Sequence, residues 1–182
     1  MNYKRRKSID VDGHIHEFTF SVYRRMPVFV RDPKCAELFL YSLDRARSQL
    51  KFSLLAYVVM PEHVHLLIQP SEGCTVARVL KAIKQPSSVR IRDHLRVANP
   101  SLVAQLVAPS KGSVENRFWQ QGGGFDRNVP DEDALGNMIN YIHMNPVRRG
   151  LCESMFDWPF SSARGYYPEL SDPPPIPIDL VG

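Results

Sequence analysis

Residues 51–70, with the sequence KFSLLAYVVMPEHVHLLIQP, decide the fold of this chain. Residues 51–60 are strongly apolar and predict a strand, a Pro-Glu pair predicts a turn, and residues 63–69 predict a second strand. Side chains two positions apart on a strand share a face, so His63 and His65 point the same way. The residues that alternate with them are apolar and face the core: Val64, Leu66 and Ile68. The stretch therefore predicts a core strand whose other face begins with two imidazoles.

Helical patterns follow the strand patterns along the chain. Apolar residues recur with helical spacing in residues 32–50, 75–85 and 131–144. Pro86 is expected to end or kink the second helix near Gln85, because proline lacks the amide hydrogen that the helix needs.

The remaining segments complete a mixed architecture. Residues 14–25 alternate with period two and predict a strand, and residues 117–129 predict short strand segments around a triple glycine. Residues 100–116 are loosely patterned and predict a loop with a short helical piece. The order is strand, helix, strand, strand, helix, strand, helix. It predicts an α+β sandwich on one mainly antiparallel sheet.

Length and composition set wide limits on function. The 182 residues carry a net charge of +4, which permits a nucleic-acid partner without requiring one. Three cysteines without disulfide or zinc spacing indicate a reducing, cytoplasmic location. The longest apolar run, residues 54–60, is too short to cross a bilayer, so no membrane partner is expected. Residues 1–167 are expected to form one domain, followed by a proline-rich tail at 168–182.

The histidine pair has two interpretations. Two imidazoles on one face of a strand can bind a single cation. Alternatively, His63 and His65 are two partly exposed histidines on the surface of a sheet. His16 is a further residue of interest, because the early strand could lie beside the strand of the histidine pair.

A second motif, NYIHMNPVRRGL at residues 140–151, lies on the last predicted helix. Tyr141 and Asn145 are one turn apart, on the flank of the apolar stripe, and both can reach over a neighbouring sheet. Asn145 can supply an amide oxygen as a third metal ligand, and Tyr141 can serve as a covalent nucleophile for a phosphodiester. The oxygen-rich substrate and the imidazoles favour Mg²⁺ or Mn²⁺. The alternative is a core-edge tyrosine and an asparagine that ends the helix before Pro146.

Four segments together resemble a known family: MPEHVHLLI, FWQ…FDRNV, YIHMNPVRRGL and WPFSSARGY. They are similar to the single-tyrosine HUH transposases of insertion sequences, of the IS200-like type, and most of all to the REP-associated tyrosine transposases. His63-Val64-His65 matches the histidine–hydrophobic–histidine motif, and Tyr141 with Asn145 matches the spacing of the tyrosine helix. The similarity runs from about residue 14 to residue 167.

The resemblance implies a fold and an activity. The fold is a ferredoxin-like (RRM-like) sandwich with helices packed on one face of the sheet. The activity is metal-dependent cleavage and rejoining of single-stranded, hairpin-forming DNA through a 5′-phosphotyrosine intermediate. Family members act as monomers or as homodimers that exchange tyrosine helices. Glu62, directly before the histidines, is expected to hold the metal or orient a ring.

Basic residues near the motifs are expected to contact DNA phosphates. They are Arg90, Arg92, Arg96, Arg148 and Arg149. Two other functions compete with the transposase. One is a non-catalytic nucleic-acid-binding module of the same fold, and the other is a metal-dependent nuclease that uses water as its nucleophile.

Overall fold

A four-stranded antiparallel sheet forms the centre of the computed structural model, which describes residues 13–110, 113–122 and 124–180. Its strands lie in the order β2-β3-β1-β6. They are β1 (Ile15–Ser21), β2 (Ser53–Val59), β3 (His63–Gln69) and β6 (Phe125–Val129). A helix separates β1 from β2 and another separates β3 from β6, which gives the split βαβ topology of the ferredoxin-like fold. The predicted α+β architecture is confirmed.

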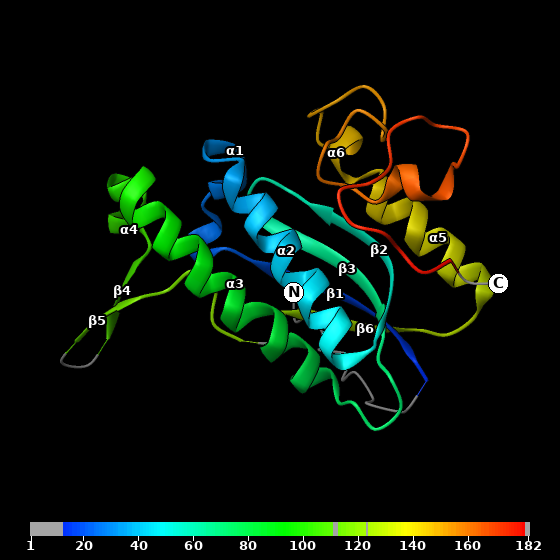
Figure 1. Cartoon of the computed structure of the whole chain (residues 1–182), viewed down its shortest axis with the longest axis horizontal. Coiled ribbons are helices and arrows are strands. Elements are labelled where there is room, and N and C mark those ends of the chain that lie inside the picture. The colour runs from blue at the N-terminus through cyan, green and yellow to red at the C-terminus, as the bar shows by residue number, and fades with distance from the viewer. Residues whose placement is uncertain (1–12, 111–112, 123, 181–182) are drawn as a thin grey trace, which may run out of the picture.

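Helices cover both faces of this sheet. The helices α2 (Lys34–Leu50) and α3 (Val76–Ala98) pack side by side on one face and enclose the main core (Figure 1). They form the predicted layer of helices on one face. The helix that carries Tyr141, α5 (Glu132–His143), packs on the opposite face against a smaller apolar cluster.

The alternation of side chains along each strand decides which residues face the helices α2 and α3 and which face α5. On β3, the apolar residues at positions 64, 66 and 68 join the core under α2 and α3, as predicted. His63 and His65 therefore point to the α5 face, next to Leu67 of the smaller cluster. The neighbouring strand β1 alternates in the same way, with Phe18 and Phe20 in the main core. The strands β1 and β3 thus present Glu17, Thr19, His63 and His65 to the α5 face.

The predicted end of the second helix at Pro86 is wrong. The helix α3 runs through Pro86 to Ala98. Its buried residues recur every four positions around and beyond the proline, with Ile83, Ser87, Ile91 and Leu95 on one stripe. The hydroxyl of Ser87 donates to the Ile83 carbonyl (2.7 Å), and the indole of Trp119 donates to the Lys84 carbonyl (3.1 Å). Packing and these side-chain bonds outweigh the hydrogen bond that proline cannot make.

The smaller elements fill in the predicted connections. Residues 100–116 contain the expected short helix, α4 (Pro100–Gln105), and also a hairpin of β4 (Val107–Ser110) and β5 (Ser113–Asn116). The short helices α1 (Val28–Arg31) and α6 (Asn145–Arg148) flank α2 and α5, and one-turn helices lie at Tyr23–Arg25 and Ala163–Tyr166. Gly124 enters β6 at φ +80°, and a side chain there would collide with the Thr19 carbonyl.

The proline-rich segment lies along the edge strand β2. Asp179 accepts a hydrogen bond from the Leu54 amide (2.8 Å) and pairs with Arg47 (2.6 Å). The Tyr57 hydroxyl exchanges hydrogen bonds with the backbone of Ile176. This segment therefore covers an edge that would otherwise expose unpaired backbone groups. Residues 1–12 and 181–182 of the predicted domain and tail lie outside the described residues. No helix of the described part is long and apolar enough to span a membrane.

Candidate active site

Two imidazoles converge at the start of β3. The Nε2 atoms of His63 and His65 lie 3.0 Å apart, and both rings are almost fully buried. Their alternation on the strand brings them to one face, and the pairing of β3 with β1 and β2 fixes the backbone on both sides. The two nitrogens therefore face one common point between the sheet and α5.

Acceptor groups hold the other nitrogen of each ring. His63 Nδ1 lies 3.0 Å from a carboxylate oxygen of Glu62. His65 Nδ1 lies 2.8 Å from the Thr19 hydroxyl and 3.5 Å from a carboxylate oxygen of Glu17. A ring that donates from Nδ1 keeps its lone pair on Nε2. The surrounding residues thus favour the tautomers in which both Nε2 lone pairs point at the same site, as in many metal-binding histidines.

The electrostatics of the pair also suit ligation. Burial, followed by the positive charge of a protonated His65, lowers the pKa of His63 to about 4, so this ring is neutral at pH 7. Burial by itself would raise the pKa of Glu62. The hydrogen bond from Arg149 (2.6 Å), the positive charge of Arg149 and the hydrogen bond to His63 outweigh burial and lower the pKa of Glu62, so Glu62 is ionised.

The phenol of Tyr141 stands beside the histidine pair. Its ring is perpendicular to the His65 ring, with the centroids 5.9 Å apart. The side chain is 38% exposed, so a substrate can reach it. The guanidinium of Arg148 lies 5.0 Å from the centroid of the phenol ring and places a positive charge next to it. Two segments more than 70 positions apart in the chain therefore meet, and both belong to one molecule.

Asn145 lies at the junction of α5 and α6. Its amide nitrogen donates to the carbonyl oxygens of Tyr141 (2.8 Å) and Ile142 (3.4 Å), so the side chain closes the end of α5. This arrangement leaves the amide oxygen as the atom that can meet a cation. The role of Asn145 as third ligand stays a prediction.

The donor set fits a hard or borderline divalent cation. Adjacent ligand atoms of an octahedral Mg²⁺ site are about 2.9 Å apart, and the two imidazole nitrogens already have nearly this separation. Two imidazole nitrogens and an amide oxygen leave the remaining positions for water or phosphate oxygens. The residues that would hold the ion are His63, His65 and Asn145.

The five predicted DNA-binding arginines lie on two different sides of the sheet. Arg148 lies at the tyrosine, whereas Arg149 is bound to Glu62 and supports the histidine pair. Arg90, Arg92 and Arg96 belong to α3, on the other side of the sheet. There Arg90 lies over the Tyr41 ring (5.2 Å), Arg92 donates to the Ser88 carbonyl (3.1 Å) and Arg96 pairs with Asp93 (2.6 Å).

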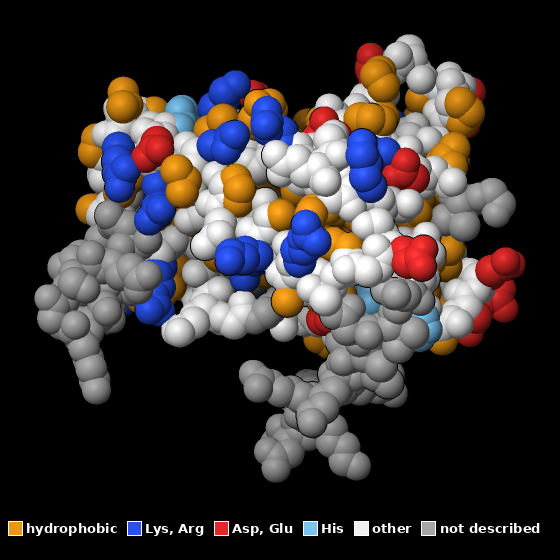
Figure 2. All heavy atoms as spheres, turned by 60° about the horizontal axis from the view of Figure 1, so that its bottom comes forward, with side chains coloured by type: hydrophobic (Ala, Val, Ile, Leu, Met, Phe, Trp, Pro, Cys, Tyr) orange, Lys and Arg blue, Asp and Glu red, His pale blue; other side chains and the backbone are white. Residues whose placement is uncertain are grey.

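A groove of about 1010 Å³ runs between α3 and residues 117–122. Arg90, Arg92 and Arg117 are among its basic lining residues. Figure 2 shows Lys and Arg side chains spread over the left and centre of one face, and Asp and Glu side chains mainly toward its right end. Gln120 in this groove donates its backbone amide to the carbonyl of Ser21 (2.8 Å), the last residue of β1, and Ser21 pairs with His63 at the start of β3. The groove thus lies close to the end of the sheet at which β3 starts.

Sequence reasoning missed two residues of the site, Glu17 and Thr19. Glu17 is 3% exposed and also accepts a hydrogen bond from Arg127 (2.9 Å). The alternation along β1 already placed both residues on the face opposite Phe18 and Phe20. It could not show which strand pairs with β1. His16 occupies the opposite face, where it stacks on Phe18 and pairs with Asp126 (3.0 Å).

Comparison with known proteins places this chain among the transposases. The family model described as "Transposase IS200 like" matches residues 11–144, which contain the whole sheet, both histidines and Tyr141. The chain belongs to the IS200-like transposase family. The resemblance drawn from the sequence motifs is confirmed.

The relatives belong to the branch that the motifs indicated. The REP-associated tyrosine transposase of Escherichia coli is 26% identical over 137 residues, which cover 72% of this chain and 70% of that protein. A Haemophilus influenzae protein described in the same terms is 25% identical over 151 residues, covering 82% and 80%. A solved structure of a REP-associated tyrosine transposase bound to a REP hairpin matches with a TM-score of 0.68 and 20% identity, covering 99% of this chain and 92% of that one. This structural likeness shows that the fold is shared.

Proposed function

We propose that this protein cleaves and rejoins single-stranded, hairpin-forming DNA through a covalent bond between Tyr141 and a 5′-phosphate. The observation that carries the proposal is the position of the Tyr141 ring, 5.9 Å from the His65 ring and on the same side of the sheet. Family membership and the relatives named as tyrosine transposases support it. The hairpin bound to the structural relative supports the choice of substrate.

Tyr141 acts as the nucleophile. Its oxygen attacks the phosphorus, the bond from phosphorus to the 3′ oxygen breaks, and the leaving oxygen gains a proton as the phenol loses one. Rejoining is the same exchange in reverse, so no external energy source is needed. Arg148 stands 5.0 Å from the phenol ring and stabilises the negative charge that develops on the phosphate.

His63, His65 and the amide oxygen of Asn145 would hold a divalent cation, Mg²⁺ or Mn²⁺. When bound, it polarises the phosphate and offsets charge in the transition state. Glu62 and Thr19 fix the two rings through their Nδ1 atoms. Arg149 keeps Glu62 ionised and in place.

The DNA follows the basic groove toward the histidine pair. Arg90, Arg92 and Arg117 contact backbone phosphates of the hairpin, and Arg148 contacts the phosphate that is cleaved. Arg96, which is exposed near the end of α3, contributes more weakly because Asp93 already pairs with it. Residues 1–167 form the catalytic domain, and the proline-rich segment that follows supports β2 through Ile176 and Asp179.

The protein acts as a monomer. Tyr141 lies beside the histidines of its own chain, so the site needs no residue from a second copy. In the described residues, the edge of the sheet at β2 is covered by the chain's own C-terminal segment, through Asp179 and Leu54. Edge-to-edge pairing of two sheets at β2 is thereby blocked.

One assay tests the proposal against its alternatives. The protein is incubated with Mn²⁺ and a labelled single-stranded hairpin, and the products are separated on a denaturing gel. A covalent protein–DNA band that is lost in Tyr141→Phe supports the proposal, whereas cleavage without such a band supports a water nucleophile. Binding without cleavage supports a non-catalytic module. His63→Ala or His65→Ala is expected to abolish cleavage and spare binding, because arginine contacts to phosphate need no cation.

A further inference from the structure

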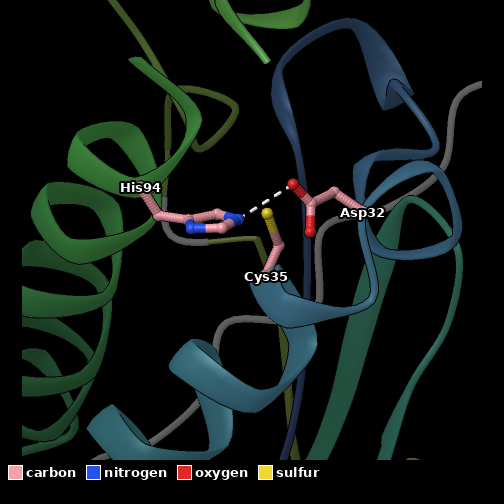
Figure 3. A group of neighbouring side chains, drawn as sticks. All are labelled: Asp32, Cys35 and His94. Carbon is pink, nitrogen blue, oxygen red and sulfur yellow. Dashed lines mark hydrogen bonds and ion pairs between the residues drawn. The ribbon is translucent and has the colours of Figure 1, made fainter. Parts of the chain in front are cut away.

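A second group of possible metal ligands lies on the other side of the sheet. It consists of Asp32, Cys35 and His94, whose ligand atoms all lie within 4.8 Å of one another. Figure 3 shows the sulfur of Cys35 pointing into the space between the His94 ring and the Asp32 carboxylate. The three side chains come from two places: the start of α2 and the last turns of α3.

Local structure holds these residues in place. Asp32 precedes α2, and its Oδ1 accepts the amide of Lys34 (3.2 Å). The amide of Cys35 donates to the Asp32 carbonyl (2.9 Å), which puts the two side chains on the same side of the first helical turn. From α3, His94 Nε2 reaches Asp32 Oδ2 at 2.9 Å. The start of α2 and the C-terminal half of α3, which are far apart in the chain, thus meet at this group of polar side chains.

The types of ligand differ from those of the histidine pair. Thiolate, imidazole and carboxylate together are the donors of zinc and similar cations, whereas Mg²⁺ and Mn²⁺ favour harder donors than thiolate. The ligand atoms of a tetrahedral zinc site are about 3.3–3.8 Å apart, so small side-chain rotations bring this group to that geometry. The side chain of Cys35 is fully buried, but those of Asp32 and His94 are 16% and 27% exposed. A cation can therefore enter from the His94 side, and water can take the fourth position.

We propose that Asp32, Cys35 and His94 bind a zinc-class divalent cation that fastens the C-terminal half of α3 to the start of α2. This half of the helix lies beyond Pro86, which breaks the chain of helix hydrogen bonds, and it carries Arg90 and Arg92 of the basic groove. The bound cation fixes the groove but takes no part in the cleavage chemistry.

Binding of the cation requires that two of its ligand atoms first lose their protons. The Cys35 thiol loses its proton to the solvent and becomes a thiolate ligand. His94 gives up the Nε2 proton that it donates to Asp32 and keeps its proton on Nδ1, so that the Nε2 lone pair faces the cation. Because the thiol proton must leave before the sulfur can bind, uptake of the cation weakens as the pH falls.

The experiment uses Co²⁺ as a spectroscopic substitute for zinc. The full-length, reduced protein with His63→Ala and His65→Ala is titrated with Co²⁺, so that the histidine pair cannot bind it. The expected result is a sulfur-to-cobalt charge-transfer band at one equivalent, which Zn²⁺ abolishes. Cys35→Ser removes the band, and the matched variants Cys74→Ser and Cys152→Ser keep it.

Thermal unfolding gives an independent measurement. In the same His63→Ala, His65→Ala background, Zn²⁺ at a hundred times its Kd raises the Tm by about 5–10 °C in the protein with Cys35 and leaves the Cys35→Ser variant unchanged. His94→Gln, at a more exposed position, gives a second test if Cys35→Ser fails to fold. The His94→Gln variant is expected to bind Co²⁺ at least tenfold more weakly. A titration without a charge-transfer band, or a band that survives Cys35→Ser, overturns the proposal. Neither outcome affects the proposed role of Tyr141.

Discussion

Replacing Thr19 by valine tests how the histidine pair is oriented. The substitution removes the hydroxyl that lies 2.8 Å from His65 Nδ1 and keeps nearly the same side-chain volume. Without this partner, the His65 ring is held through Nδ1 only by Glu17, at 3.5 Å. The ring is then less well fixed with its Nε2 toward the cation, so the variant is expected to bind the cation more weakly.

The size of the effect follows from these contacts. One neutral hydrogen bond contributes about 0.5–1.5 kcal/mol, and removing a residue that orients a metal ligand costs about 10–100-fold in metal affinity. Glu17 remains as a partial substitute, so the lower end of this range applies. Thr19→Val is therefore expected to raise the Mn²⁺ concentration for half-maximal cleavage about tenfold.

The assay is a Mn²⁺ titration of hairpin cleavage, with DNA binding measured in parallel. At saturating Mn²⁺ the cleavage rate of Thr19→Val returns close to that of the unmodified protein, and the affinity for DNA does not change. Thr19→Ser keeps the hydroxyl and serves as the matched control with a normal Mn²⁺ requirement. An unchanged Mn²⁺ requirement in Thr19→Val would refute the idea that this hydroxyl orients His65.

Three further predictions test the arrangement of the site and the pH dependence of the fold. Mixing inactive His63→Ala with inactive Tyr141→Phe restores no cleavage, because each site is built within one chain; recovered activity in the mixture would indicate exchanged helices. Arg149→Gln raises the Mn²⁺ requirement and leaves the salt dependence of DNA binding unchanged. Arg148→Gln reduces the magnitude of the slope of log K against log salt by about 0.7, because one phosphate contact is lost. Equal slopes for the two variants would contradict this division of roles. Burial lowers the pKa of His143 from its usual 6.5 to about 4, so the unfolded chain binds more protons between these values and stability falls as the pH drops through that window. The loss in the free energy of unfolding attributable to His143 is about 3 kcal/mol. It is measured by urea unfolding from pH 7 to pH 4, as the difference between the protein and His143→Gln. Identical pH profiles for the two would disprove it.

Much of the fold could be predicted from local patterns. The period-two alternation of β1 and β3 gave both the strands and their buried faces, because each strand has one face in the core. The course of α3 could not be predicted at Pro86. Continuation of that helix depends on the indole of Trp119 and the hydroxyl of Ser87, and the contact between them appears only in the folded chain.

The site was partly predictable for the same reason. The spacing of His63 with His65 predicted a shared face, because side-chain direction on a strand is a local property. The partners of these rings depend on the register between β1 and β3, which pairs Thr19 with His65, and no local pattern fixes that register. Likewise Arg149 and its neighbour Arg148 look equivalent in sequence. Their position after α5 turns one toward Glu62 and the other toward the phenol of Tyr141.

The most direct test of the central claim is the chemical identity of the protein–DNA bond. The covalent product formed with Mn²⁺ and a single-stranded hairpin is digested with protease and nuclease, and the modified peptide is sequenced by tandem mass spectrometry. We expect a nucleotide joined through its 5′-phosphate to the oxygen of Tyr141. A nucleotide on any other side chain, or a hairpin that is cleaved while Tyr141 stays unmodified throughout the reaction, would contradict the proposed function.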